Sequence, residues 1–183
     1  MGVSKKVLSK CCLWGFDLLM IFICLGTQIF PMNRVLIEID NLIEKQLIKE
    51  EVFAQIGKSD YHPKHYSYKE FINPDEYDDI VKRSDLIVSH GGTGAIIKGL
   101  KANKQIIAIP RLKKYGEHED DHQLQIVKFF YDGGYIEAVE EEKDLYVAIE
   151  KLRKNPIQKK YEGKGEIINI IDDYIKATFD LGK

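Results

Sequence analysis

The stretch Asp85-Leu86-Ile87-Val88-Ser89-His90-Gly91-Gly92-Thr93-Gly94 decides the fold. Its first five residues form a compact apolar run of strand length, and the glycines that follow indicate a tight turn. A helical pattern then continues through Ile96, Ile97 and Leu100. A buried strand that passes through a glycine turn into a helix is typical of open α/β sheets, in which ligands bind beyond the carboxyl ends of the strands.

Strand and helix patterns alternate along the rest of the chain. We expect strands at residues 21–25, 51–56, 66–71, 85–89, 105–109 and 135–136. We expect helices at residues 35–47, 74–82, around 96–100, and at 124–130, 145–152 and 166–179. This alternation predicts an α/β fold with a Rossmann-like, mostly parallel sheet, right-handed crossovers and helices on both faces.

Length, charge and cysteine content narrow the class of protein. A chain of 183 residues is long enough for one well-packed domain and too short for two Rossmann domains. The formal net charge is −2 with both signs interspersed, so nucleic acid is not an expected partner. Cys11, Cys12 and Cys24 suit neither a disulfide framework nor a zinc site, and they favour a reducing cytoplasm.

The N-terminal segment allows two interpretations. Lys5 and Lys6 precede an apolar run at residues 11–30, which could indicate a signal peptide or a membrane anchor. Asp17 interrupts that run, and residues 21–25 have the pattern of a short buried strand. We favour the strand, with one folded domain at residues 20–183 and a poorly ordered leader or over-extended start at residues 1–19.

The glycine turn is the first candidate binding site. Glycines after a strand let backbone N–H groups approach an anion at the start of a helix, and the Thr93 hydroxyl adds a donor. His90 could orient the turn or contact a phosphate. The alternative is that the glycines only close a tight corner. The pattern lacks the Gly-Lys-Ser/Thr ending of a P-loop and does not match G-x-G-x-x-G, so an NTPase or a dehydrogenase is disfavoured.

A second polar cluster follows the next predicted strand. It comprises Pro110-Arg111 and the stretch Tyr115-Gly116-Glu117-His118-Glu119-Asp120-Asp121-His122-Gln123. Loops at the ends of neighbouring strands can converge on one ligand, although a solvated charged loop is the alternative. Residues 118–122 also match the zinc-protease pattern H-E-x-x-H. They follow a loop and no histidine lies downstream, so we expect no metal site.

Several separated motifs together resemble a known family. They are Gly26-Thr27-Gln28 with Phe30-Pro31, Phe53-Ala54-Gln55-Ile56-Gly57, the glycine turn, Pro110-Arg111 through Lys114-Tyr115-Gly116-Glu117-His118, and Asp121-His122-Gln123. This set resembles the C-terminal domain of glycosyltransferase family 28 from about Met20 to about Tyr135. More closely, it is similar to the small subunits of bacterial exopolysaccharide and capsule glycosyltransferases, and to the eukaryotic subunit that pairs with a membrane partner to extend dolichol-linked sugar.

The resemblance implies the donor-binding half of a GT-B glycosyltransferase. It implies a UDP-sugar as substrate, no further cofactor, and these donor-binding residues: Gly26, Thr27, Ser89, His90, Gly91, Gly92, Thr93, Gly94, Arg111, His118, Asp121, His122 and Gln123. Arg111 and His118 are the candidate catalytic residues, with Arg111 as the charge beside the departing diphosphate. Lys98 stands where relatives often carry a glutamate that holds the ribose.

The resemblance also implies a partner. The acceptor-binding half and the usual base belong in relatives to another domain, so we expect a membrane-attached glycosyltransferase subunit to supply both. The pair would transfer a hexose to a polyprenyl-phosphate-linked saccharide in exopolysaccharide or capsule biosynthesis, at the cytoplasmic face of the plasma membrane. A non-catalytic activating subunit and a free-standing nucleotide-binding module are the alternatives.

Overall fold

A computed structural model of the chain describes residues 20–161, which form a six-stranded sheet. The strands are β1 (Met20–Cys24), β2 (Glu51–Gln55), β3 (Ser67–Lys69), β4 (Leu86–His90), β5 (Gln105–Ile109) and β6 (Glu137–Ala138). Their order is β3-β2-β1-β4-β5-β6, and every neighbouring pair is parallel. The predicted Rossmann-like parallel sheet is confirmed, and the direction of strand progression reverses between β1 and β4.

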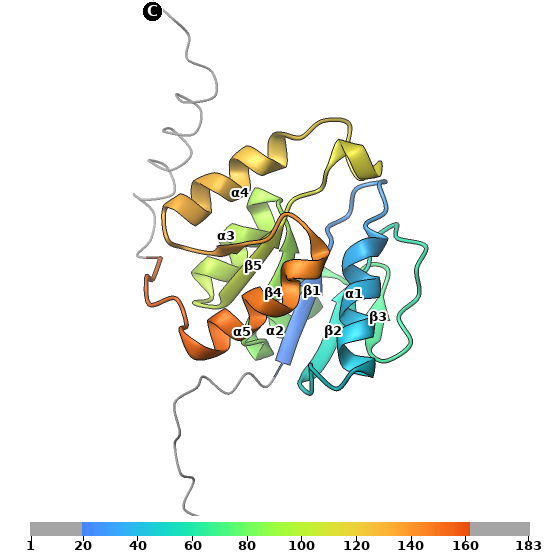
Figure 1. Cartoon of the computed structure of the whole chain (residues 1–183), viewed down its shortest axis with the longest axis horizontal. Coiled ribbons are helices and arrows are strands. Elements are labelled where there is room, and N and C mark those ends of the chain that lie inside the picture. The colour runs from blue at the N-terminus through green and yellow to red at the C-terminus, as the bar shows by residue number, and fades with distance from the viewer. Residues whose placement is uncertain (1–19, 162–183) are drawn as a thin grey trace, which may run out of the picture.

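Helices cover both faces of this sheet, as predicted (Figure 1). On one face α1 (Asn33–Glu44) and α5 (Leu145–Lys154) pack in one hydrophobic core. On the other face α2 (Pro74–Arg83), α3 (Thr93–Lys101) and α4 (His122–Asp132) pack in a second core. Two short 3₁₀ helices, Lys113–Tyr115 and Glu142–Asp144, lie in the connections.

The two cores explain why the central strands are apolar throughout. Successive side chains of a strand point to opposite faces, so Ile21 and Ile23 enter one core while Phe22 and Cys24 enter the other. A strand covered on both faces therefore lacks the apolar-polar alternation of a half-exposed strand. Each fully buried isoleucine or phenylalanine contributes about 1.5–3 kcal/mol to folding.

For residues 20–24, the structure decides between the two interpretations of the N-terminal apolar run in favour of the strand. Met20–Cys24 is a fully buried strand at the centre of the sheet, paired with β2 and β4. Within residues 20–161, no helix combines the length and apolarity needed to cross a membrane. The leader predicted at residues 1–19 and the helix predicted at 166–179 lie outside the described residues.

Two of the differences from the predicted boundaries have the same physical cause. Helix α1 ends at Glu44 and not at Leu47, because Gln46 adopts a positive φ and the Leu47 N–H turns back to Leu42. The last strand is β6 and not residues 135–136, because Gly134 closes α4 in the same way and the Tyr135 N–H bonds back to Phe130. In both places a residue in the left-handed conformation ends the helix. The next N–H group then bonds back to the helix, so Leu47 does not continue α1 and Tyr135 does not begin β6.

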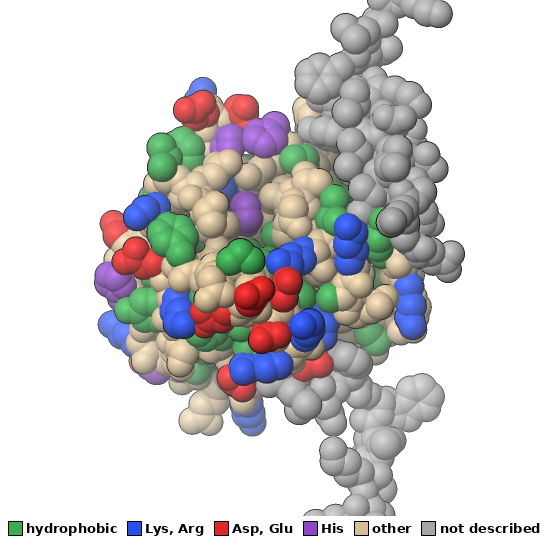
Figure 2. Space-filling view, turned by 180° about the vertical axis from the view of Figure 1, so that it is seen from behind, with side chains coloured by type: hydrophobic (Ala, Val, Ile, Leu, Met, Phe, Trp, Pro, Cys, Tyr) green, Lys and Arg blue, Asp and Glu red, His purple; other side chains and the backbone are tan. Residues whose placement is uncertain are grey.

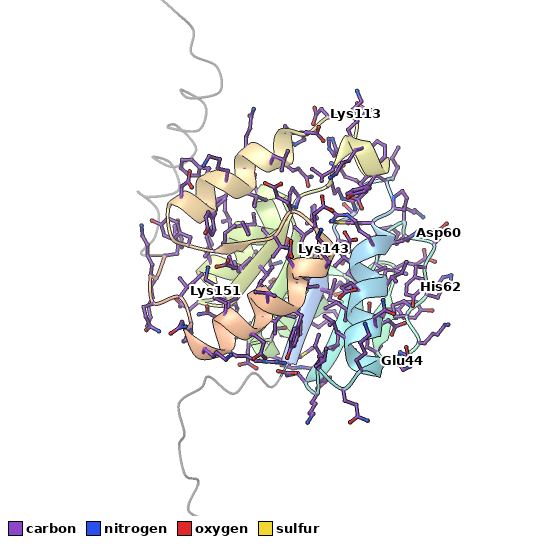
Figure 3. All side chains as sticks on the ribbon, in the orientation of Figure 1. Glu44, Asp60, His62, Lys113, Lys143 and Lys151 are labelled. Carbon is purple, nitrogen blue, oxygen red and sulfur yellow. The ribbon has the colours of Figure 1, made fainter. Side chains whose placement is uncertain are left out.

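The long connection between β2 and β3 is fastened to α1 by one buried carboxylate. Asp40 is 3% exposed and accepts hydrogen bonds from the Tyr61 hydroxyl at 2.6 Å and from the backbone N–H groups of Lys64 and His65. Burial acts to raise the pKa of Asp40, but these donors hold it below its usual value. Figure 3 labels Asp60 and His62 on this connection, which runs beside α1.

We predict that Asp40→Ala lowers the free energy of unfolding by about 1–3 kcal/mol, because buried donors lose their acceptor. The measurement is urea unfolding at pH 7. Glu44→Ala is the matched control, since this exposed carboxylate on the same helix should change stability by less than about 0.5 kcal/mol. A lowered native pKa stabilises the fold above the unfolded pKa, so the deficit of Asp40→Ala should shrink as the pH falls below about 4. Equal stability of the two variants at pH 7 would contradict the anchoring role.

Candidate functional site

A groove of about 440 Å³ opens at the carboxyl ends of β1 and β4, where the strand order reverses. Open α/β folds bind ligands at this position, and pockets of about 300–1,000 Å³ accommodate small molecules. The groove is lined by the ends of β1, β2 and β4 and by α2, α3 and the loops before them: Cys24, Gly26, Thr27, Gln28, Gln55, Ile72, Pro74, Tyr77, His90, Gly92, Gly94, Ala95 and Lys98.

Part of the predicted donor site lines this groove, namely Gly26, Thr27, His90, Gly92 and Gly94. Other predicted residues of the turn face elsewhere. The Ser89 hydroxyl donates to the carbonyl of His90, and Gly91 is buried against α4. Thr93 begins α3 and does not line the groove.

Sequence reasoning missed Gln55 and Tyr77 as groove residues. The Gln55 amide donates to the carbonyl of Gly26 at 3.2 Å, and the Tyr77 hydroxyl donates to the Cys24 sulfur at 3.3 Å. Both side chains therefore hold the end of β1 from neighbouring elements. For Gln55 the sequence offered two signals, a polar residue at the end of a buried strand and a place in the motif Phe53-Ala54-Gln55-Ile56-Gly57.

The His90 ring is held between two glycines. A Cβ on Gly26 would lie 2.7 Å from the ring, and a Cβ on Gly92 would lie 2.4 Å from its Nε2. The Cys24 carbonyl lies 3.0 Å from Nδ1, and because a carbonyl only accepts, Nδ1 carries the proton and Nε2 is an acceptor. Burial lowers the pKa of His90 to about 4. The imidazole is therefore neutral at pH 7 and brings no positive charge to the groove.

The start of α3 presents backbone donors to the groove. Gly92 is the N-cap residue, and no side chain caps the helix. The Gly92 N–H donates to the His90 carbonyl at 2.6 Å, so the first helical N–H groups, those of Thr93, Gly94 and Ala95, are the ones left for an anion. The expected anion-binding donors thus lie just after the glycine pair. Gly92 has a φ of −78°, so close approach of the His90 ring explains the glycine, not a left-handed backbone.

Lys98 brings positive charge to the groove. It is the one charged side chain among the described residues that line this hollow. Its ammonium pairs with Asp78 and lies 4.3 Å from the centre of the Tyr77 ring, and its side chain is 40% exposed. Because Lys98 lies one helical turn after Gly94, the two residues share a face of α3. An anion at the start of α3 would therefore meet both the helix N–H groups and an ammonium.

The Arg111 side chain is buried behind the groove and is not placed for direct contact with a phosphate. Its side chain is 0% exposed, and its guanidinium donates to the carbonyls of Leu25, Phe30, Pro31 and Glu117 at 2.7–3.3 Å. Burial lowers the pKa of Arg111, and the nearby Glu117 carboxylate partly offsets this effect. Arg111 therefore joins the loop after β1 to the loop after β5, and it does not line the groove.

The loop after β5 reaches the same edge of the sheet but uses several predicted site residues internally. The Asp121 carboxylate accepts from the Lys113 N–H at 2.8 Å, and the Gln123 side chain accepts from the Arg111 N–H at 3.0 Å. The His118 ring lies 5.7 Å from that of Phe30, which belongs to the loop after β1. The loops after β1 and β5 therefore meet through packing at the rim and not inside the groove.

His118 and His122 come together at this rim. Their ring centres are 4.6 Å apart, and Asp120 lies against both. His122 is the first residue of α4 and His118 lies before the helix, so the pair does not have the one-helix arrangement of a zinc protease. Figure 2 shows histidine side chains gathered at the upper rim of this face, with acidic side chains nearby.

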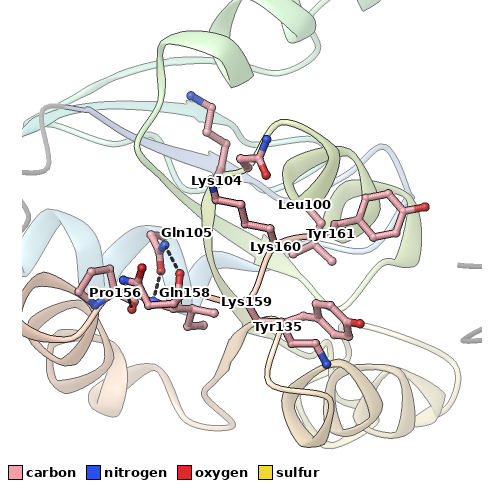
Figure 4. Close-up of a pocket in the computed structure, with 11 residues that line it drawn as sticks. Leu100, Lys104, Gln105, Tyr135, Pro156, Gln158, Lys159, Lys160 and Tyr161 are labelled. Atoms are coloured by element: carbon pink, nitrogen blue, oxygen red, sulfur yellow. Dashed lines mark hydrogen bonds between the residues drawn. The ribbon is translucent and has the colours of Figure 1, made fainter. Parts of the chain in front are cut away.

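A second hollow lies near the amino-terminal end of β5, at the opposite end of the strands from the groove. It has a volume of about 290 Å³ and includes Lys104, Gln105, Tyr135 and Lys159 in its lining (Figure 4). The Gln105 side chain exchanges two hydrogen bonds with the backbone of Ile157, at 2.9 and 3.1 Å. Since Gln105 begins β5, this hollow is remote from the strand ends that carry the glycine turn.

The sequence matches the family model of the glycosyltransferase family 28 C-terminal domain over residues 20–177. No significant match was found among curated proteins.

Solved structures with the same fold include the glycosyltransferase of kitacinnamycin, with a TM-score of 0.57 and 15% identity over 85% of this chain. The solution structure of ALG13 matches with a TM-score of 0.55 and 17% identity over 84% of the chain. MurG of Acinetobacter baumannii matches with a TM-score of 0.53 and 16% identity over 86%. The matches span 38% of the kitacinnamycin enzyme, 50% of MurG and 94% of ALG13. Identities this low establish the fold alone.

We predict that Gly92→Ala raises the pKa of His90 from about 4 toward 6.5. The added Cβ would occupy the place of the ring, and displacing the ring toward water removes the burial that depresses its pKa. The measurement is an NMR titration of the His90 ring protons. Gly94→Ala is the control, because a Cβ there meets no atom within 4 Å and the pKa should not move. A folded Gly92→Ala protein with an unchanged His90 pKa would refute this geometry.

Proposed function

We propose, on the premise that this chain belongs to glycosyltransferase family 28 through its C-terminal domain, that its groove binds the diphosphate of a UDP-sugar. The observation that carries the proposal is the pairing of an uncapped α3 N-terminus with the Lys98 ammonium at the reversal of strand order. Helix N-termini at such positions bind phosphate groups in nucleotide-binding folds. The family and the groove thus support the same class of ligand.

The expected energetics favour direct hydrogen bonds over the helix dipole. The dipole at a helix start contributes about 0.3–1 kcal/mol, whereas each hydrogen bond to a charged group contributes about 1.5–3 kcal/mol. Two N–H groups at the start of α3 and one ammonium would therefore supply most of the affinity for a diphosphate. These interactions also stabilise the diphosphate as it departs, without requiring proton transfer to it.

The other predicted residues have supporting roles in this proposal. Thr27 and the Nε2 acceptor of His90 would contact hydroxyl groups of the nucleotide. His118 and His122, at the rim, would face the sugar. Arg111 would act as a positioning residue, because it fixes the loops that flank the glycine turn.

We further propose that the chain is one half of a two-component transferase. The described match spans nearly all of ALG13 but half or less of the other two relatives, and this likeness in extent to ALG13 supports the proposal. A membrane-attached partner would supply the acceptor site and the base, and would hold this subunit at the cytoplasmic face of the plasma membrane. The acceptor would be a polyprenyl-phosphate-linked saccharide of exopolysaccharide or capsule biosynthesis, and the transferred group a hexose. The alternative is an activating subunit without a catalytic role.

The isolated chain should bind UDP but transfer no sugar. Calorimetric titration with UDP measures the first property, and incubation with UDP-hexoses and a lipid-linked acceptor measures the second. Adding the membrane partner should restore transfer. Efficient transfer by the purified chain alone would contradict the two-component proposal, and absence of UDP binding would contradict the donor-site proposal.

The Lys98 ammonium should contribute to the affinity for the phosphates of UDP and not to the affinity for its nucleoside. We predict that Lys98→Gln weakens UDP binding about tenfold or more, equal to about 1.4 kcal/mol, and changes uridine binding by less than about twofold. Lys98→Arg should retain most of the affinity. Lys101→Gln is the control, because it removes the same charge from the exposed end of α3. Equal losses of affinity for UDP and uridine would show that Lys98 contacts the nucleoside. Equal losses of UDP affinity in the Lys98 and Lys101 variants would show that only the overall charge of the protein matters.

A further inference from the structure

The loop between Tyr115 and α4 brings three metal-ligating side chains together. One ligand atom from each of His118, Asp120 and His122 lies within 4.8 Å of the other two. His118 Nδ1 is 3.2 Å from Asp120 Oδ1, and His122 Nδ1 contacts the same oxygen. Two imidazole nitrogens and one carboxylate oxygen thus converge from five consecutive residues.

Packing and backbone hydrogen bonds hold this arrangement. The Asp120 carboxylate accepts the backbone N–H of His122 at 3.1 Å, which fixes it at the start of α4. The His118 side chain is only 11% exposed and packs beside Phe30. Asp120 and His122 remain 62% and 42% exposed, so an ion can reach the cluster from solvent. The ligands are therefore ordered on one side and accessible on the other.

The geometry points to a metal site, and we propose that His118, Asp120 and His122 bind a divalent transition-metal ion. Mixed imidazole and carboxylate donors suit Zn²⁺ and neighbouring first-row ions, whereas Mg²⁺ and Ca²⁺ prefer sites made of oxygen. Three protein ligands leave coordination positions open, as in sites that bind a water or a ligand oxygen.

This inference departs from the expectation drawn from the sequence. In the helical H-E-x-x-H arrangement that the sequence pattern resembles, Glu119 would be the functional carboxylate. In the structure His118 precedes the helix, and the carboxylate between the two imidazoles belongs to Asp120. The competing explanation is that Asp120 only accepts hydrogen bonds from two imidazoles and that no ion binds.

The cluster lies on the edge of the sheet that carries the groove. His118 packs on Phe30 in the loop after β1, and Gly26 of the same loop lines the groove. An ion held here would add positive charge beside the proposed diphosphate site. The site itself is independent of the proposed nucleotide binding and can be tested without any nucleotide.

The test is a Zn²⁺ titration of the tag-free full chain at pH 7.5 in competition with a chromophoric chelator, with no UDP present. The chain should bind one equivalent of Zn²⁺. Asp120→Asn and His122→Ala should each weaken Zn²⁺ binding at least tenfold. The matched control is Glu119→Gln, which removes the same charge from the same loop and should leave the affinity unchanged. His65→Ala controls for a histidine outside the cluster. Co²⁺ should give visible absorption bands of a site with nitrogen and oxygen ligands, and Asp120→Asn should diminish them.

Two outcomes would overturn the proposal. One is a wild-type chain that binds no Zn²⁺ below about 100 μM, an affinity that corresponds to only about 5.5 kcal/mol. The other is an equal loss of affinity in Asp120→Asn and Glu119→Gln, which would show attraction to the acidic loop and no defined ligand set. Circular dichroism of each variant verifies that the fold is kept. UDP titration of the metal-free chain tests the nucleotide site separately, so failure of one proposal leaves the other standing.

Discussion

The groove depends on the buried guanidinium of Arg111. This group comes from the end of β5 and reaches the carbonyls of Leu25, Phe30 and Pro31 in the loop after β1, passing the intervening strand β4. Removing such a charge from water is costly, and the cost is offset here because four carbonyl oxygens surround the guanidinium. The loops on both sides of the glycine turn are thereby held at fixed positions, and the shape of the groove follows from them.

A second arginine stabilises the loop from the opposite face. Arg34 of α1 donates to both carboxylate oxygens of the buried Glu117 at 2.9 and 3.2 Å and to the carbonyl of Pro110 at 2.8 Å. Glu117 also accepts the Leu112 N–H, so one carboxylate organises the start of this loop. Arg34 also pairs with Glu142 at 3.2 Å, so two carboxylates balance the two guanidinium groups behind the groove. The two arginines therefore act on the groove through the position of its loops.

The sequence alone predicted those element boundaries that are determined by neighbouring residues in the chain. Strand β5 has the predicted bounds because an apolar run ends at Pro110, and α2 begins as predicted because the Asn73 side chain caps it. The burial of Arg111 could not be predicted, because three of its four carbonyl partners lie 80 or more residues away and arginine is usually exposed. Gln55 and Tyr77 were missed for the same reason, since their roles arise only when β2 and α2 pack beside the end of β1.

The chemistry of the groove also bears on the need for a partner. Among its lining residues, within the described part of the chain, there is no carboxylate, and the imidazole of His90 has a pKa of about 4. A group with so low a pKa is a weak base at pH 7. Glycosyl transfer to a hydroxyl requires that the hydroxyl lose its proton. In the proposed function, the groove residues act on the departing diphosphate, and the base that activates the acceptor comes from outside the groove lining.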